Sequence, residues 1–337
     1  MIIENYSLRD LNTFGLDVKA SYFVEIKSIS DIKKLLELKS PEYSKSLVLG
    51  LGSNILFTKD FDGLVIKNSL QEIEIEDERE NEVFIKAGGG IIWDDLVNYC
   101  VENSYWGIEN LSLIPGTVGA APVQNIGAYG VELKDVFYSL NGIYLDDGKS
   151  QTFSKEESQF GYRSSLFKKE LKNKFLITNI ILRLSKRPAL RLNYRELKKK
   201  FESREENKIT LREIRNSVIE IRKNKLPDPV ELGNAGSFFK NPIISNNELI
   251  NLQKHFKDIV YFKIDNKHSK ISAGWLIEKC GLKGFRKENV GTYPKQALII
   301  VNYGKATGKE IYEFSQKIQL KVKDKFGVLL EPEVNIL

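Results

Sequence analysis

The sequence predicts an α+β fold, because short β-type runs and amphipathic helical patterns follow one another along the whole chain. The chain has 337 residues, of which 42% are hydrophobic and 28% charged, so it is long enough for roughly two or three hydrophobic cores. The β-type runs cover residues 47–49, 64–67, 83–87, 175–184, 297–302 and 328–336. The clearest helical patterns cover residues 91–103, 272–279 and 309–326.

The first β-type run leads into a glycine-rich turn, Gly50-Leu51-Gly52-Ser53-Asn54, and the chain then returns to an apolar run at Ile55. Such a turn presents successive backbone N–H groups, with Ser53 and Asn54 as side-chain partners, and can hold a diphosphate. It is not the Rossmann fingerprint, because Ile55 stands at the third glycine position and no helix follows. A plain hairpin turn explains the pattern equally well.

A second segment, from Leu113 to Gly130, follows the helical pattern at 91–103 and consists almost entirely of small residues. Small side chains allow the backbone to approach something flat or bulky, while Gln124, Asn125 and Tyr129 offer a few directed polar contacts. A tightly packed interdomain loop is the alternative interpretation. The two segments together favour a dinucleotide site that is not of the Rossmann type.

The net charge of +6 comes from a basic excess that is concentrated between Lys186 and Lys225, where glutamates are interleaved with the lysines and arginines. This mixture is typical of solvated helix faces rather than of a polynucleotide-binding surface. Arg195 and residues 198–200 remain candidates for attracting the phosphates of a small molecule. The two prolines of Leu226-Pro227-Asp228-Pro229 then indicate a domain boundary.

The run Gly233-Asn234-Ala235-Gly236-Ser237-Phe238-Phe239-Lys240-Asn241-Pro242 presents the hydroxyl of Ser237 on a glycine-rich turn. A nucleophilic serine most often has a histidine base. The chain contains only His255 and His268, both in a lysine-rich stretch that we expect to be loop-like. Because the Gly-x-Ser-x-Gly frame is also missing, the pattern disfavours a hydrolase and leaves Ser237 as a proton donor or a phosphate contact.

Two helical patterns complete the chain. Residues 272–279 precede Gly281, a residue type that commonly ends helices. Residues 309–326 place five apolar side chains on one stripe, namely Ile311, Phe314, Ile318, Val322 and Phe326.

Composition and local patterns also exclude several classes. Cys100 and Cys280 lack metal-ligand spacing and are too few for a disulfide framework, so we expect reduced, packed thiols and no metal site. No stretch approaches the roughly 18 apolar residues of a membrane span, and the N-terminus does not resemble a signal peptide. We therefore expect a cytoplasmic, monomeric protein that binds neither membrane nor nucleic acid.

Several motifs occur together and in the order of one family, and the chain resembles the UDP-N-acetylenolpyruvoylglucosamine reductases from Asn12 to Glu333. The motifs are Gly50–Phe57, Ile114–Gly130, Phe160-Gly161-Tyr162-Arg163, Lys225-Leu226-Pro227-Asp228, Gly233–Pro242, Ala273-Gly274-Trp275 and Leu330-Glu331-Pro332-Glu333-Val334. The resemblance implies a non-Rossmann FAD-binding fold of two α/β-type subdomains (PCMH-type) plus a separate α+β substrate domain. The implied domains are 1–70 with 327–337, 71–222, and 223–326 for the UDP-sugar.

The resemblance also implies an activity. NADPH would reduce FAD, and the reduced flavin would reduce the enolpyruvyl group of a UDP-sugar to give UDP-N-acetylmuramate for peptidoglycan synthesis. By the family's pattern Arg163 and Glu333 assist the enolate, and Ser237 donates the proton. The residues implied to hold FAD are Gly50, Gly52, Ser53, Asn54, Ile114, Pro115, Gly116, Thr117, Gly119, Gln124, Asn125 and Gly127. Those implied to bind the UDP-sugar are Tyr129, Tyr194, Lys225, Asn241 and Gln296.

The resemblance leaves two details open. The family's longer form has an aromatic residue on a loop that covers the substrate, and either Tyr261 or Phe262 fills that position here. Glu333 could be protonated and donate to the substrate carboxylate, or be ionised and hold Arg163 in place. Two other classes also explain the glycine-rich segments, namely a different flavin oxidase or dehydrogenase and a nucleotide-binding module without activity.

Overall fold

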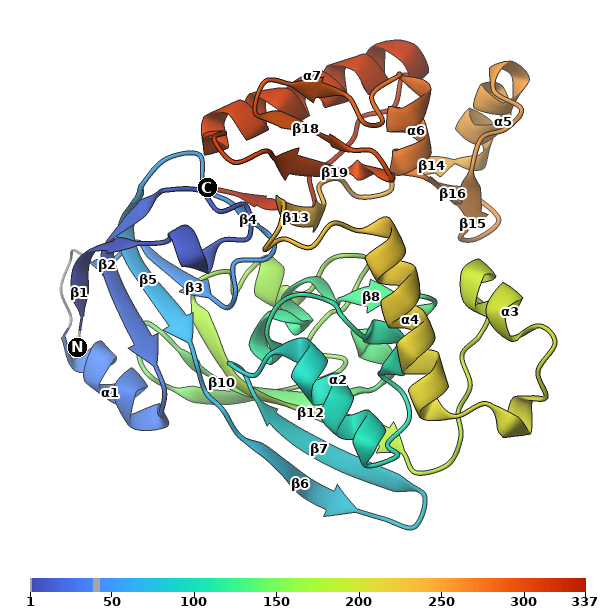
Figure 1. The fold of residues 1–337 in the computed structure, drawn as a ribbon. Helices are drawn as coiled ribbons and strands as arrows, with labels where there is room; N and C mark the ends of the chain where they lie inside the picture. The colour runs from blue at the N-terminus through green and yellow to red at the C-terminus, as the bar shows by residue number, and fades with distance from the viewer. Residues whose placement is uncertain (1, 39–42) are drawn as a thin grey trace. The chain divides into compact units, whose positions relative to one another are not determined.

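The computed structural model describes residues 2–38 and 43–337 of the chain. These sort into two compact units, each assembled from segments that are far apart in the sequence (Figure 1). Unit 1 comprises Met1–Tyr6, Ala20–Leu51 and Asp62–Asn224. Unit 2 comprises Ser7–Lys19, Gly52–Phe61 and Lys225–Leu337.

A small mixed sheet forms the N-terminal part of unit 1. Its strand order is β1-β2-β5-β3, with β1 (Ile3–Ser7), β2 (Lys19–Ile26), β5 (Phe61–Asn68) and β3 (Ser46–Leu49). β3 and β5 run parallel, so the β-type runs expected at 47–49 and 64–67 are confirmed. Helix α1 (Ile29–Glu37) packs on this sheet through Ile32 and Leu35, and a capping box between Ser28 and Asp31 fixes its start.

A second, five-stranded sheet forms the rest of unit 1. Its order is β11-β10-β12-β7-β6, with β11 (Ser150–Ser154), β10 (Phe137–Tyr144), β12 (Phe175–Ser185), β7 (Glu82–Gly88) and β6 (Ile73–Glu78). The runs expected at 83–87 and 175–184 are therefore confirmed as neighbouring antiparallel strands. The edge strand β6 reads Ile-Glu-Ile-Glu-Asp-Glu, and such charges protect a sheet edge from further pairing.

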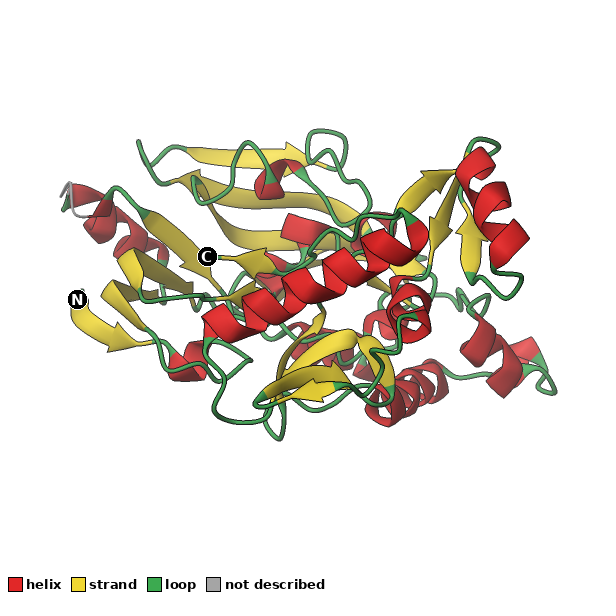
Figure 2. Ribbon diagram, turned by 90° about the horizontal axis from the view of Figure 1, so that it is seen from above, coloured by secondary structure: helices red, strands yellow, loops and turns green. Residues whose placement is uncertain are grey.

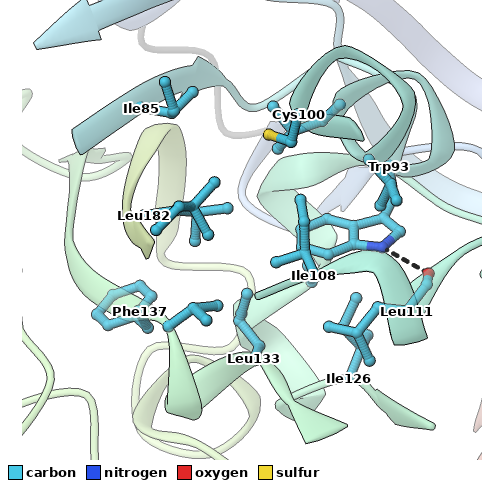
Figure 3. Close-up of a cluster of buried hydrophobic side chains, with 14 of the residues drawn as sticks. Ile85, Trp93, Cys100, Ile108, Leu111, Ile126, Leu133, Phe137 and Leu182 are labelled. Atoms are coloured by element: carbon cyan, nitrogen blue, oxygen red, sulfur yellow. Dashed lines mark hydrogen bonds between the residues drawn. The ribbon is translucent and has the colours of Figure 1, made fainter. Parts of the chain in front are cut away.

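The main core of unit 1 lies between this sheet and helix α2 (Trp93–Glu102). Figure 3 shows Ile85 and Leu182 of the sheet on one side of the cluster and Trp93 and Cys100 of α2 on the other. The Trp93 Nε1 donates to the Leu111 carbonyl at 3.0 Å, which satisfies the one polar atom of this buried ring. Cys100 is fully buried, as expected of a packed thiol.

Two further helices of unit 1 carry the charged stretch of the sequence. They are α3 (Arg195–Phe201) and α4 (Leu211–Lys225). α4 turns Leu211, Ile214 and Val218 into the core. Its Arg212, Glu220 and Lys223 are exposed, as expected of a solvated helix face, whereas Arg215 is buried and departs from that interpretation. No helix in the described ranges is long and apolar enough to cross a membrane.

A four-stranded antiparallel sheet organises unit 2. Its order is β13-β19-β18-β17, with β13 (Gly233–Ser237), β19 (Gln296–Asn302), β18 (Val290–Tyr293) and β17 (Arg286–Lys287). Helices α6 (Ala273–Lys279) and α7 (Gly308–Phe326) pack on β19. α7, the longest helix in Figure 2, buries the five apolar residues of the expected stripe and ends at Gly327, where φ is +69°.

Unit 2 also contains a small three-stranded sheet, β14-β16-β15, beside helix α5 (Asn246–His255). Its strands are β14 (Ile243–Ser245), β16 (His268–Ile271) and β15 (Tyr261–Lys263). The expectation that both histidines lie in loops is wrong, because His255 ends α5 and His268 begins β16. A serine N-cap at Ser245 with Glu248 at N3 nucleates α5, a signal that sequence analysis overlooked.

The C-terminal segment is less regular than expected. Only β20 (Asn335–Ile336) of the run 328–336 is a strand, and it pairs in parallel with β4 (Ile55–Leu56). Pro332 has no N–H to donate to a ladder, and it forms only an isolated bridge with Phe239. The remaining short elements are β8 (Gly127–Ala128), β9 (Val131–Glu132) and the 3₁₀ turns at 9–11, 109–111, 118–120, 122–124, 133–135, 166–168 and 206–208.

The three domains implied by the resemblance remain a prediction. The described contacts group the chain differently, into two units, although the long segment of unit 2 starts at Lys225, close to the expected boundary at 223. The segment 327–337 belongs to unit 2 together with 52–61, which explains why the last strand pairs with β4.

Candidate active site

The two glycine-rich segments that the sequence singled out meet in unit 1. A Cβ atom at Gly50 would lie 2.5 Å from the Thr117 Oγ1, which is closer than side-chain atoms tolerate. Only glycine allows the turn after β3 to lie this close to the small-residue segment. The prediction that both segments serve one site is therefore compatible with their placement.

The small-residue segment is held from the other side by residues 88–90, three consecutive glycines at the end of β7. Gly119 N donates to the Gly89 carbonyl at 2.8 Å, and Val118 N donates to the Ile91 carbonyl at 2.9 Å. Sequence analysis missed this triplet. Three glycines directly after a β-type run are a signal of close backbone approach that could have identified it.

These segments fit a flat, phosphate-bearing cofactor. Their surfaces carry little or no side chain, so that backbone groups can approach the cofactor closely. In unit 1 lie the predicted cofactor residues Gly50, Ile114, Pro115, Gly116, Thr117, Gly119, Gln124, Asn125 and Gly127. In unit 2 lie the other three, Gly52, Ser53 and Asn54.

Within unit 2, the turn at Gly52 is tied to the C-terminal segment. Gly52 has φ +63°, and a Cβ atom there would lie 2.0 Å from the Leu11 carbonyl oxygen, so no other residue fits. Asn54 Nδ2 donates to the Glu333 carbonyl at 3.3 Å. Asn335 N donates in turn to the Asn54 carbonyl at 3.0 Å. Asn54 therefore fixes the backbone that carries Glu333.

Ser237 is the exposed last residue of β13, between two anchored parts of the chain. Before it, the buried Asn234 accepts a hydrogen bond from Gly236 N at 2.9 Å, and Gly236 takes φ +68°. After it, Phe238 and Phe239 are 0% and 1% exposed. The hydroxyl is thus presented to solvent on a rigid backbone.

The segment that carries Glu333 runs alongside the residues that follow Ser237. Glu333 N donates to the Phe238 carbonyl at 2.8 Å, and Lys240 N donates to the Glu331 carbonyl at 2.9 Å. Lys240 Nζ also lies 3.1 Å from the Glu331 carboxylate. Two of the three predicted catalytic residues, nearly one hundred positions apart in sequence, are therefore held on adjacent backbone in unit 2.

The third predicted catalytic residue, Arg163, lies in unit 1 on a tight turn closed by hydrogen bonds between Gly161 and Ser164. Arg163 has φ +52°, a left-handed conformation that is unusual for a residue with a side chain. Its Nη2 donates to the Gly127 carbonyl at 2.8 Å. This bond directs the guanidinium along the small-residue segment.

Tyr129 and Tyr194, two of the predicted substrate contacts, lie together in unit 1. Their rings are 5.0 Å apart and nearly perpendicular. Burial raises the pKa of Tyr129, and burial together with the charge of Glu196 raises the pKa of Tyr194 to about 12. Both phenols therefore stay protonated and can donate to an anion at neutral pH.

Sequence analysis missed Arg222, which lies beside this pair. Burial lowers the pKa of Arg222, whereas the nearby Tyr129 and Asp94 raise it. An arginine remains charged in proteins, so Arg222 adds a buried positive charge next to two phenolic donors. It lies one helical turn before Lys225, the last residue of α4. The lysine-rich composition of this stretch concealed that Arg222, like Arg215 of the same helix, points inward.

An ion pair anchors α4 to the start of the small-residue segment. Arg215 donates from both terminal nitrogens to Asp94, at 2.7 and 3.0 Å, and Leu113 N donates to the same carboxylate at 2.5 Å. Burial alone would raise the pKa of Asp94, but these hydrogen bonds and the charges of Arg215 and Arg222 lower it. Asp94 is therefore ionised and holds Leu113, which has φ +58°.

The remaining predicted substrate contacts lie in unit 2. Asn241 Oδ1 accepts from the N–H of Ala273 at 2.9 Å, at the start of α6. Gln296 Oε1 accepts from the N–H of Leu298 at 3.4 Å. Each amide oxygen thus accepts a hydrogen bond from the backbone, which fixes the orientation of the side chain.

Tyr261 and Phe262 lie on opposite faces of strand β15. Tyr261 pairs with the buried Ile271, whereas Phe262 pairs with Lys270, whose Nζ lies 6.0 Å from the Phe262 ring. Because residues directly opposite each other share a face, the two rings project from opposite faces of the small sheet, and both are exposed, Tyr261 by 43% and Phe262 by 51%.

No serine–histidine pair occurs among the residues that the structure describes. His268 Nδ1, at the start of β16, lies 3.2 Å from the exposed carboxylate of Asp265. Neither histidine forms a hydrogen bond with Ser237. The chemistry of Ser237 therefore does not rest on an imidazole base.

Comparisons with known proteins agree with the sequence motifs. A family model described as UDP-N-acetylenolpyruvoylglucosamine reductase, C-terminal domain, matches residues 228–337. A model described as FAD binding domain matches residues 20–154.

Full-length relatives carry the same description. The UDP-N-acetylenolpyruvoylglucosamine reductase of Amoebophilus asiaticus is 46% identical over 334 residues, 99% of this chain and 98% of the relative. That of Pseudomonas aeruginosa is 43% identical over 333 residues, again 99% of this chain and 98% of the relative. The crystal structure of the Thermus caldophilus reductase matches with a TM-score of 0.69 at 23% identity, covering 100% of this chain and 98% of that chain. This likeness confirms the expected fold.

Proposed function

The chain belongs to the UDP-N-acetylenolpyruvoylglucosamine reductase family, and from this premise we propose an NADPH-dependent reduction of the enolpyruvyl UDP-sugar to UDP-N-acetylmuramate. FAD is its cofactor. When bound, FAD would supply the hydride-transfer chemistry between NADPH and C3 of the enolpyruvyl group. We propose that the reaction takes place in the cytoplasm, where both nucleotide substrates are found.

We propose that the two glycine-rich segments hold FAD through backbone groups. The contact between Gly50 and Thr117 supports this role, because a side chain at Gly50 would separate the segments. In unit 2, Ser53 and Asn54 follow the Gly52 turn and supply side-chain partners for a diphosphate.

Ser237 is proposed as the proton donor. Addition of hydride to C3 leaves a negative charge at C2 that is delocalised into the carboxylate, and transfer of the Ser237 hydroxyl proton to C2 completes the reduction. A serine hydroxyl is a weak acid, but a carbanion is a strong base, so position matters more than acidity. The rigid backbone on either side of Ser237 supports this role. Solvent then returns the proton to the serine.

Arg163 and Glu333 are proposed to stabilise the enolate. A guanidinium is always charged and presents a planar fork that suits a carboxylate. Removing one such electrostatic donor typically costs about 3–4 kcal/mol of transition-state stabilisation. For Glu333, the register of its backbone with Phe238 supports action on the same group that Ser237 protonates.

The UDP part of the substrate is proposed to bind Tyr129, Tyr194 and Lys225, with Asn241 and Gln296 as amide donors. The protonated phenols and the buried charge of Arg222 support an anionic ligand at this position in unit 1. A diphosphate accepts hydrogen bonds from these phenols, and its negative charge balances the positive charge of Arg222.

The observation that carries the proposal is the fixed register between the Ser237 strand and the Glu333 segment in a member of this family. Anaerobic titration of the purified protein tests it. NADPH should bleach the flavin, and the enolpyruvyl UDP-sugar should then restore the oxidised spectrum. Bleaching without recovery would indicate a different flavin dehydrogenase, and absence of flavin would indicate a nucleotide-binding module.

A further inference from the structure

The turn that carries Arg163 is held in a conformation that its own sequence does not favour. Arg163 adopts φ +52°, although residues with a Cβ rarely adopt the left-handed region. Gly161 N donates to the Ser164 carbonyl at 2.9 Å, and Ser164 N donates back at 3.3 Å. Such a left-handed conformation persists only where contacts with surrounding residues stabilise it.

Three hydrogen bonds join this turn to residues 123–127, and each runs from a side chain to a backbone carbonyl. They run from Ser165 Oγ to Val123 at 2.7 Å, from Asn125 Nδ2 to Gly161 at 3.2 Å and from Arg163 Nη2 to Gly127 at 2.8 Å. All of these residues belong to unit 1. The turn and the small-residue segment therefore form one connected structure.

Asn125 stands at the centre of this structure, and its side chain is 0% exposed. Its Nδ2 donates to Glu132 Oε2 at 3.0 Å and to the Gly161 carbonyl at 3.2 Å. Its Oδ1 accepts from Lys134 N at 3.0 Å. An amide NH₂ has two protons, and both are used inside the protein. The side chain thus links the Arg163 turn, through the Gly161 carbonyl, to Glu132 and Lys134.

The backbone of Asn125 limits which residues could replace it. Asn125 has φ +45°, a region that asparagine and glycine enter more readily than other residues. Of these two, only asparagine carries the donor that reaches the Gly161 carbonyl. Both the conformation and the hydrogen bond therefore select asparagine here.

We propose that Asn125 is a positioning residue for Arg163. Its amide holds the Gly161 carbonyl, which fixes the left-handed turn and keeps the guanidinium aligned with the Gly127 carbonyl. The inference rests on the proposed function, in which Arg163 stabilises the negative charge that develops on the substrate. It assigns to the Asn125 side chain a task other than contact with FAD.

The test compares Asn125→Gly with Asn173→Gly. Asn173 also has a left-handed backbone, with φ +58°, and lies on a turn outside the candidate site, so its replacement is the matched control. Glycine suits both backbones, and the first substitution therefore removes the amide without adding strain. The measurements are the Kd of the UDP-sugar for the oxidised enzyme without NADPH, the rate of flavin reduction by NADPH, and the rate of flavin reoxidation by the UDP-sugar.

Asn125→Gly should slow reoxidation by about 10- to 100-fold and weaken UDP-sugar binding, because a misplaced catalytic group loses rates of that order. Flavin reduction by NADPH should stay within about 2-fold, since it does not use Arg163. Asn173→Gly should leave all three quantities unchanged. A merely structural asparagine would instead lower flavin content and both half-reactions alike.

A double-mutant cycle with Arg163→Lys decides whether Asn125 acts through Arg163. In the Arg163→Lys background, Asn125→Gly should change Kd and reoxidation by less than about 2-fold. Equal effects in both backgrounds would overturn the proposal. If Asn125→Gly fails to fold, Ser165→Ala replaces it in the same cycle, because it breaks another bond between the same segments. A wild-type protein that the UDP-sugar does not reoxidise would instead refute the proposed function itself.

Discussion

Replacement of Arg215 by methionine tests how α4 holds the start of the small-residue segment. The Arg215 and Asp94 side chains are 10% and 23% exposed, and two hydrogen bonds of 2.7 and 3.0 Å join them. Loss of one partner from a buried pair costs about 3–5 kcal/mol. Asp94 is partly exposed and keeps the N–H of Leu113, so we expect a loss of about 2–3 kcal/mol in the free energy of unfolding.

The pH dependence of this loss follows from the pKa of Asp94. In the wild type this pKa lies below its usual value of 3.8, so the pair stabilises the protein above that pH, and the stabilisation is lost as the pH falls through the lowered pKa. Without Arg215, burial of Asp94 favours its protonated form. The variant should therefore lose stability as the pH rises above about 4, and the difference from wild type should grow towards neutral pH.

Urea denaturation of the two proteins, followed by circular dichroism, measures this difference in the free energy of unfolding. We choose pH 4.5, roughly one unit above the usual carboxyl pKa, and pH 7.5, where a carboxyl with the usual pKa is fully ionised. Arg212→Met is the matched control, because Arg212 is an exposed arginine on the same helix. A loss below about 1 kcal/mol at neutral pH, or one equal to that of the control, would refute the reasoning.

Three further changes test separate parts of the account. Lys225→Ala should raise the KM for the UDP-sugar about 10-fold with unchanged FAD content, and an unchanged KM would argue against diphosphate contact. Phe262→Ala should raise the same KM more than Tyr261→Ala, because Phe262 shares its face of β15 with Lys270, whose charge attracts phosphates; the reverse order would identify Tyr261 as the aromatic residue that covers the substrate. Gly50→Ala should lower the flavin content of the purified protein, since a Cβ atom would lie 2.5 Å from the Thr117 Oγ1, and full flavin content would disprove close approach.

Periodicity predicted the regular elements well. The stripe of α7 follows from helical spacing of its apolar residues, and β7 and β12 follow from apolar runs that are buried at nearly every position. The same reasoning failed at 328–336, where the apolar residues are interrupted by Pro332 and pair with distant backbone. Local spacing does not reveal a partner that lies far away in the sequence.

The candidate site was only partly accessible from sequence. Glycine-rich runs indicated the segments at Gly50 and Thr117, because close backbone approach requires small residues. Arg222 was hidden in a charged helix, and its burial emerges only from packing against Tyr129. The hydrogen-bond partners of Asn125 likewise depend on tertiary contacts with the Arg163 turn. A sequence motif marks such residues without distinguishing ligand contact from support of a neighbour.

In the proposed mechanism, Ser237 supplies the proton in the second half-reaction. Anaerobic stopped-flow absorbance with Ser237→Ala tests it most directly. NADPH should reduce the flavin of this variant at nearly the wild-type rate, and the enolpyruvyl UDP-sugar should then fail to reoxidise it. Reoxidation at the wild-type rate, or an equal loss of both half-reactions, would contradict the account.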